Sequence, residues 1–113
     1  MAIRMEKPWQ ALTRETVERL PGQLGVYQIA DRNGEILLIG FAGGRSLFGL
    51  RGEIEAQCDA EPGAPDRQFR YEVNTQYWSR YQELLMVYIA DHGEPPSGNA
   101  DSLPSSLGRL DPL

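Results

Sequence analysis

The amino-acid sequence predicts an α+β fold in which a small three-stranded sheet is flanked by helices. Two apolar runs on either side of Asn33-Gly34 predict a β-hairpin. The alternation of apolar and polar residues in 69–73 predicts a third strand, and residues 75–91 carry apolar side chains at helical spacing. A chain of 113 residues is expected to form one compact domain around a single core.

Composition and charge limit the classes of function. The chain has 41% hydrophobic and 24% charged residues, as is usual for a globular protein. Its net charge of −5 disfavours a broad nucleic-acid surface, because such surfaces are normally basic. Any contact with phosphate must therefore be local.

Cysteine usage and hydropathy indicate the compartment. Cys58 is the single cysteine, so an internal disulfide and a cysteine-rich zinc site are both excluded. The first ten residues lack an apolar signal segment, and no run approaches the ~18 apolar residues of a membrane span. We expect a cytoplasmic protein that does not contact a membrane.

The first part of the chain, residues 1–22, is predicted to be a lead-in followed by a helix. Thr13 is a suitable N-cap, Pro21-Gly22 ends the helix after Leu20, and Leu12, Val17 and Leu20 form an apolar seam. This helix is expected to cover the core.

The hairpin is the centre of the predicted domain, residues 23–99. Asn33-Gly34 is typical of a two-residue type I′ turn, since both residues tolerate positive φ. Opposed residues point to the same face of a sheet, so the absence of a side chain at Gly40 would leave an open flank beside Tyr27 where a ligand could bind. The turn would pair Arg32 with Glu35, Ile29 with Leu38, and Tyr27 with Gly40.

A second helix is predicted from Ser46 to about Cys58, after a flexible Gly43-Gly44 turn. Glycines at 49 and 52 disfavour the helix interior, which allows an irregular helix or a later start. Arg51 falls inside the apolar stripe of this helix, where its side chain must either extend to water or meet a partner. The stripe consists of Leu47, Leu50, Ile54 and Cys58.

The last elements are a strand, a long helix and a tail. After an acidic loop that ends near residue 66, the third strand spans Phe69–Val73, and the final helix spans about Thr75–Asp91. Residues 100–113 form a Pro- and Ser-rich tail, for which contact with a second copy of the chain is one possible role. The apolar arc of the final helix consists of Tyr77, Tyr81, Leu84, Leu85 and Tyr88.

Two short motifs on the hairpin resemble a known signature. Gly25-Val26-Tyr27 is followed after ten residues by Leu38-Ile39-Gly40, which resembles the two-part signature of the GIY-YIG nuclease superfamily. An arginine on the next helix, a glutamate on a later helix and a final asparagine follow in the family's order: Arg51, Glu83 and Asn99. The resemblance spans residues 24–99. It implies a three-stranded antiparallel sheet and metal-dependent hydrolysis of DNA or RNA phosphodiester bonds.

The resemblance also implies roles for individual residues. Arg51 would hold the scissile phosphate, and Glu83 would bind Mg²⁺ or Mn²⁺ together with water and phosphate oxygens. The hydroxyl of Tyr27 would activate the attacking water, which requires a lowered pKa. Asn99 would brace the site. Arg45 is a further candidate for a phosphate contact, and Gly40 for contact with the substrate.

The sequence departs from the family at the second motif. Leu38 stands where the family usually has tyrosine, so a hydroxyl that would share the work of Tyr27 is missing. Two hypotheses follow. Either the domain is a slower nuclease that relies on Tyr27, or it is a catalytically degenerate module of this fold that binds nucleic acid or a protein partner.

Overall fold

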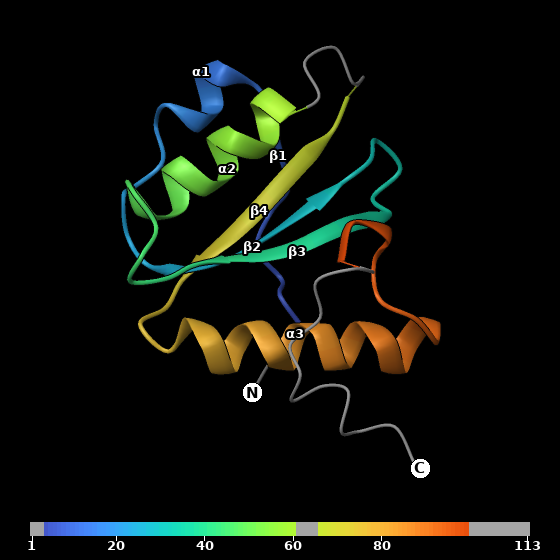
Figure 1. The fold of residues 1–113 in the computed structure, drawn as a ribbon. Coiled ribbons are helices and arrows are strands. Elements are labelled where there is room, and N and C mark those ends of the chain that lie inside the picture. Colours follow the sequence, from blue (N-terminus) through green and yellow to red (C-terminus); the bar gives the residue numbers. More distant parts are fainter. Residues whose placement is uncertain (1–3, 61–65, 100–113) are drawn as a thin grey trace.

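The computed structural model describes residues 4–60 and 66–99 and confirms an α+β fold. An antiparallel sheet lies between α1 and α2 on one side and α3 on the other (Figure 1). The order of its strands is β1-β4-β2-β3. Their bounds are β1 Gln10–Ala11, β2 Gly25–Ala30, β3 Ile36–Ala42 and β4 Gln68–Val73.

The prediction of three strands was wrong by one. The lead-in contributes β1, in which Gln10 pairs with Phe69 and Ala11 with Gln68. Strand β1 has only two residues and no β-branched or aromatic side chain, so the sequence pattern gave no sign of it. The lead-in is thus part of the sheet.

The hairpin has the expected register but a different turn. Tyr27 pairs with Gly40 and Ile29 with Leu38, as predicted, but Ala30 pairs with Ile36 after a register shift. The amide of Gly34 donates to the carbonyl oxygen of Asp31 at 3.0 Å, and Gly34 has φ 85°. This is a three-residue loop rather than the predicted two-residue turn. The bulge next to Ile29 offsets the extra residue and restores the predicted register.

The side chain of Asp31 explains the choice of turn. Its Oδ1 accepts hydrogen bonds from the amides of Asn33 at 2.8 Å and Glu35 at 3.0 Å. An aspartate at the first position and a glycine at the fourth are typical of a type I turn, so residues 31–34 contained this signal.

Each face of the sheet has its own hydrophobic core. On one face, Tyr27, Ile29 and Phe69 pack with Leu50 and Ile54 of α2. The other face packs against α3 through Val26, Ile39, Tyr81, Leu84 and Leu85. Strand β2 contributes to both faces and is buried throughout, which explains why it lacks polar alternation.

The first two helices differ from the prediction in their bounds. Helix α1 spans Arg14–Val17, and the Oγ1 of Thr13 accepts from the Thr16 amide at 3.2 Å, so the predicted N-cap is confirmed. Helix α2 spans Gly49–Ala60. It begins late because Phe48, with φ 63°, has a left-handed backbone that does not continue a right-handed helix, and Gly49, its first residue, still has φ 56°. Leu47, predicted to face inward, lies before the helix and is 77% exposed.

Helix α3 spans Tyr77–His92 and is followed by a short 3₁₀ helix, η1, at Ser97–Asn99. The predicted apolar arc of α3 faces the sheet, whereas Met86 is exposed, so this helix is not packed on every side. No helix in the described ranges is long and apolar enough to cross a membrane. The tail 100–113, proposed above as a contact between two copies, lies outside these ranges.

Candidate functional site

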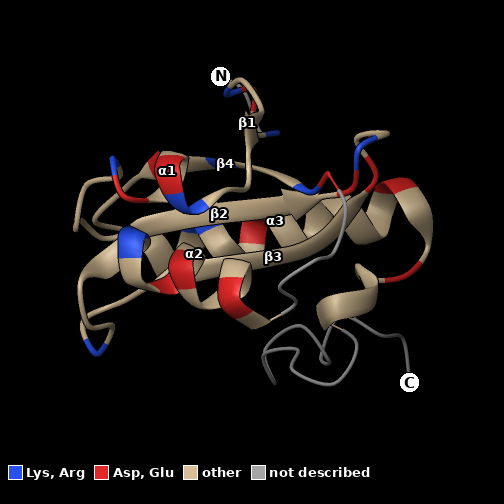
Figure 2. Ribbon diagram, turned by 90° about the horizontal axis from the view of Figure 1, so that it is seen from above, with Lys and Arg blue, Asp and Glu red and all other residues tan. Residues whose placement is uncertain are grey.

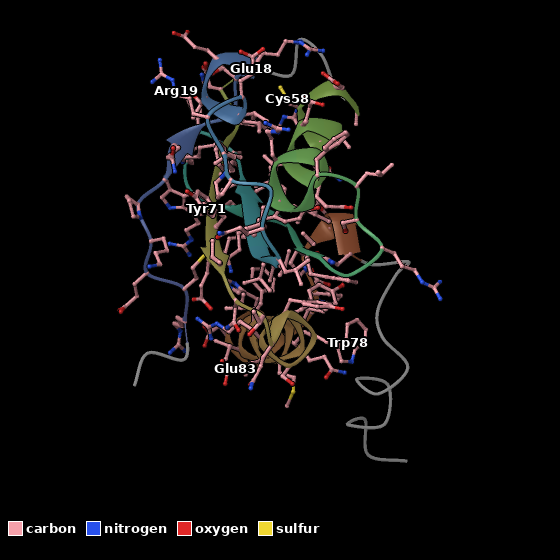
Figure 3. All side chains as sticks on the ribbon, turned by 90° about the vertical axis from the view of Figure 1, so that its left-hand side faces the viewer. Glu18, Arg19, Cys58, Tyr71, Trp78 and Glu83 are labelled. Atoms are coloured by element: carbon pink, nitrogen blue, oxygen red, sulfur yellow. The ribbon has the colours of Figure 1, made fainter. Side chains whose placement is uncertain are left out.

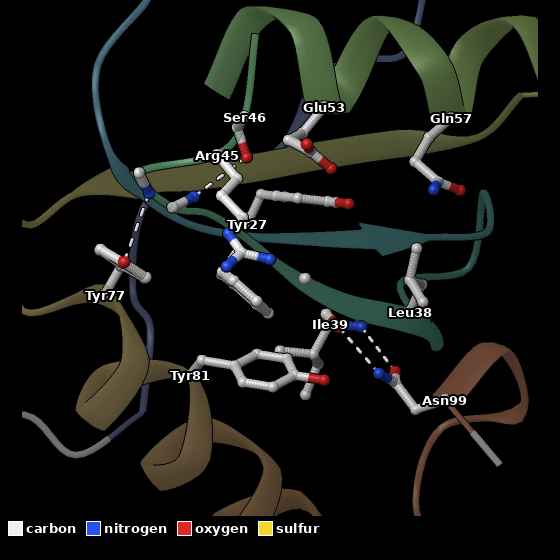
Figure 4. Close-up of a pocket in the computed structure, with 14 residues that line it drawn as sticks. Tyr27, Leu38, Ile39, Arg45, Ser46, Glu53, Gln57, Tyr77, Tyr81 and Asn99 are labelled. Atoms are coloured by element: carbon white, nitrogen blue, oxygen red, sulfur yellow. Dashed lines mark hydrogen bonds between the residues drawn. The ribbon is translucent and has the colours of Figure 1, made fainter. Parts of the chain in front are cut away.

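A hollow of about 640 Å³ lies at the free edge of β3, between α2 and α3. Strand β3 forms its floor, while α2 overhangs from one face of the sheet and the start of α3 from the other (Figure 4). We call it the edge hollow. The side chains that line it and matter most below are Tyr27, Arg45, Glu53, Gln57, Tyr81 and Asn99.

Tyr27 reaches the edge hollow across the strand pair. It is 3% exposed, and its ring covers Gly40, because a methyl group at residue 40 would lie 2.3 Å from Tyr27 Cζ. The expected open flank beside Gly40 is therefore absent, since the tyrosine ring fills it. Gly40 contributes space for the ring and does not contribute an additional subsite.

The environment of Tyr27 does not favour a general base. Burial raises the pKa of its phenol above the ordinary 10.0, and the nearby Glu53 carboxylate raises it further. The neighbouring Gln57 amide offsets only part of this shift. The lowered pKa that general-base catalysis by Tyr27 would require is therefore not found, since burial and the Glu53 carboxylate both raise it. Tyr27 stays protonated and can donate a hydrogen bond.

Glu53 and Gln57 were missed by the sequence analysis. They lie one turn apart on α2 and both line the edge hollow, so their side chains share a face of the helix (Figure 4). The i, i+4 spacing was visible in the sequence. Nothing in the sequence pattern, however, showed that this face of the helix would overhang the edge of β3.

The loop after β3 closes one end of the edge hollow. The amide of Gly44 donates to the hydroxyl of Tyr77 at 3.3 Å, and the amide of Gly43 donates to the Oγ of Ser46 at 3.0 Å. These bonds hold the exposed Arg45 at the mouth of the hollow, as Figure 4 shows. Arg45 and Tyr27 thus line the same hollow.

Asn99 lies at the other end of the edge hollow and bonds to the edge strand β3 as a neighbouring strand would. Its Nδ2 donates to the carbonyl oxygen of Ile39, and its Oδ1 accepts from the Ile39 amide, both at 2.8 Å. One side-chain amide thus satisfies both outward-facing backbone groups of an edge-strand residue. Asn99 is 1% exposed and lines the edge hollow, so its side chain fixes the edge of β3 next to the hollow.

Arg51 lies apart from these residues. Its guanidinium is 5.7 Å from the centre of the Phe48 ring, and it does not line the edge hollow. The helix explains this position: Arg51 and Glu53 flank the buried stripe of Leu50 and Ile54 on opposite sides, about 160° apart at 100° per residue. Arg51 and Tyr27 therefore do not line the same hollow, in contrast to the shared site that the resemblance implies.

Glu83 is also placed elsewhere. It lies on the opposite side of α3 from Trp78 (Figure 3), where its Oε1 accepts a hydrogen bond from Nη1 of Arg80. Arg80 also bonds Glu72, with Nε to Oε2 at 2.9 Å. Glu83 does not line the edge hollow. It extends an ion-pair cluster between α3 and β4.

These positions do not fit the metal site expected on Glu83. A guanidinium already occupies Oε1 of this carboxylate, and the phenol of Tyr27 lies in a different part of the structure. Within residues 4–60 and 66–99, no three acidic, histidine or cysteine side chains are grouped as metal ligands. The predicted set is thus divided: Tyr27, Gly40, Arg45 and Asn99 come together, whereas Arg51 and Glu83 do not.

Comparison with known families gives a match that covers most of the chain. Residues 3–91 match the family model described as Domain of unknown function (DUF7508). The chain belongs to this family. The match to DUF7508 includes β1 and the lead-in, in agreement with their place in the sheet, and ends before Asn99. Comparison with curated proteins gives no significant match.

Proposed function

We propose that this DUF7508 domain is a catalytically degenerate GIY-YIG-like module that binds a partner in the edge hollow without cleaving it. The observation that supports this function most strongly is the separation of Tyr27 from both Arg51 and Glu83. Metal-assisted phosphodiester hydrolysis requires groups that activate water, hold phosphate and hold metal around one phosphorus atom. Arg51 and Glu83 do not line the edge hollow with Tyr27, which disfavours joint action of these three groups on one phosphate.

The ionisation of Tyr27 supports the same proposal. A general base works best when its pKa lies near the working pH, whereas the pKa of this phenol is shifted upward by burial. Leu38 provides no second hydroxyl. The remaining polar groups of the edge hollow, among them Gln57 and Glu53, can form hydrogen bonds to a bound group.

A cleavage assay tests the proposal directly. The full chain is incubated with Mg²⁺ or Mn²⁺ and with branched, single-stranded and duplex DNA and RNA. We expect no cleavage above that of a preparation lacking the protein. Metal-dependent cleavage that disappears in both Arg51→Ala and Glu83→Ala would overturn the proposal and establish the nuclease alternative.

A further inference from the structure

Glu53 is an unpaired charge in the wall of the edge hollow. It is partly buried and forms no ion pair or hydrogen bond with any other residue of the described ranges 4–60 and 66–99. Glu53 interacts electrostatically with the phenol of Tyr27. A carboxylate drawn partly out of water is stabilised by a cation or a hydrogen-bond donor. Glu72 illustrates this, since it has Arg80 as a partner.

Aromatic rings surround the same space. Phe41, Tyr77 and Tyr81 line the edge hollow with Tyr27, and Phe41 lies 5.7 Å from Tyr77 and 4.8 Å from Tyr81 between ring centres. The faces of aromatic rings attract cations. A carboxylate beside several such rings forms an environment suited to a positively charged organic group.

The charge of the surrounding helix favours the same class of ligand. Three of the four charged residues on α2 are acidic, and they appear as red bands in Figure 2. They are Glu53, Glu55 and Asp59. With a net charge of −5 for the chain, this field repels a polyanion and attracts a cation.

We propose that the edge hollow receives the guanidinium or ammonium group of an arginine or lysine side chain from a protein partner, with Glu53 as its counter-ion. The inference rests on the proposed binding function and specifies its ligand. The hydroxyl oxygen of Tyr27 and the carbonyl oxygen of Gln57 line the same wall and can accept hydrogen bonds from the guest. Arg45, exposed at the mouth, repels such a guest and so limits its affinity.

A neutral isostere provides the first test. The isotope-labelled full chain is titrated with the peptide acetyl-Gly-Arg-Gly-amide and with the same peptide carrying citrulline, and the amide NMR signals of Gly40, Gly43 and Gly44 are followed. We expect saturable shifts with arginine and affinity lower by about tenfold or more with citrulline, because a charge-assisted hydrogen bond is lost. No saturable shift, or equal affinity for the two peptides, would overturn the inference.

Two charge changes with opposite signs provide the second test. Glu53→Gln should weaken binding of the arginine peptide by about tenfold, and Arg45→Ala should strengthen it several-fold. Glu55→Gln is the matched control, since it removes the same charge from the same helix outside the edge hollow, and it should weaken binding much less than Glu53→Gln does. Preserved amide dispersion shows that each variant is folded.

The reverse pattern would contradict the inference while leaving the binding function intact. If a short oligodeoxythymidine binds, weakens with Arg45→Ala and strengthens with Glu53→Gln, the ligand is an anion. Equal losses from Glu53→Gln and Glu55→Gln would also contradict a specific counter-ion. Cleavage of the oligonucleotide would instead overturn the proposed function, so the two failures are distinguishable.

Discussion

The ring of Tyr27 lies over the α-carbon of Gly40, its partner across β2 and β3. The packing is so close that a methyl group at residue 40 would approach the phenol oxygen to 2.4 Å. An aromatic ring that covers a glycine on a neighbouring strand supplies the contacts that the glycine lacks. The pair therefore fixes the phenol at the wall of the edge hollow.

Gly40→Ala tests this contact. The new methyl group must displace the Tyr27 ring, so we expect the free energy of unfolding to fall by roughly 1–3 kcal/mol. Urea denaturation followed by circular dichroism provides the measurement. Gly44→Ala is the control, because a methyl group there has no neighbour within 4 Å. Equal free energies of unfolding for the two variants would show that the position of the Tyr27 ring does not require a glycine at residue 40.

Asn99 provides a second prediction. Asn99→Ala removes two buried hydrogen bonds to Ile39, and we expect a loss of about 2–3 kcal/mol in the free energy of unfolding. Asn99→Asp should be at least as costly at pH 7, since a carboxylate would face the Ile39 carbonyl oxygen. At low pH the protonated aspartic acid can donate a hydrogen bond to the Ile39 carbonyl oxygen. The Asn99→Asp variant should then lose less free energy of unfolding than Asn99→Ala. Ser97→Ala is the control. If Asn99→Asp were no more stable than Asn99→Ala at low pH, the hydrogen bonding of Asn99 to Ile39 would be contradicted.

The cluster of Glu72 and Arg80 predicts a pH dependence of stability. Burial alone would raise the pKa of Glu72, but hydrogen bonds from Arg80 and Asn74 outweigh it and lower the pKa below the ordinary 4.5. A lowered pKa in the folded state means that the stabilisation is present above pH 4.5 and is lost as the pH falls through the folded value.

Glu72→Gln measures this contribution. At pH 7 we expect it to reduce the free energy of unfolding by roughly 1–2 kcal/mol, and the difference from the unmodified chain should shrink below pH 4.5. Glu15→Gln, at an exposed pair with Arg19, should show little effect at either pH. A difference for Glu72→Gln that is independent of pH would contradict the assignment.

Local sequence patterns predicted the parts of the fold that depend on neighbouring residues. The apolar runs of the hairpin, the seam of α1 and the arc of α3 all have the expected positions, because hydrophobic periodicity determines which face is buried. Strand β1 could not be predicted, since its two residues become a strand only through pairing with β4. The late start of α2 depends on the left-handed backbone at Phe48, a conformation that bulky residues rarely adopt.

The candidate site was only partly predictable for a related reason. The hairpin register placed Tyr27 next to Gly40, and chain order alone suggested that Arg51 and Glu83 would join them. Whether a helical residue joins the edge hollow depends on which side of its helix faces the edge of β3. On α2 that side carries Glu53 and Gln57, and on α3 it carries Tyr77 and Tyr81. The spacing of residues along one helix does not specify which side faces β3, because that also depends on the angle at which the helix packs against the sheet.

The most direct test of the binding function is the ionisation of Tyr27. Chemical shifts of ¹³Cζ-labelled tyrosine, assigned with Tyr27→Phe, report the pKa of each phenol in the folded chain. We predict that Tyr27 stays protonated beyond pH 10.0, and that Glu53→Gln lowers its pKa without bringing it to that value, because burial is the larger cause. A Tyr27 phenol that ionises below pH 10.0 would contradict the account and restore its candidacy as a general base.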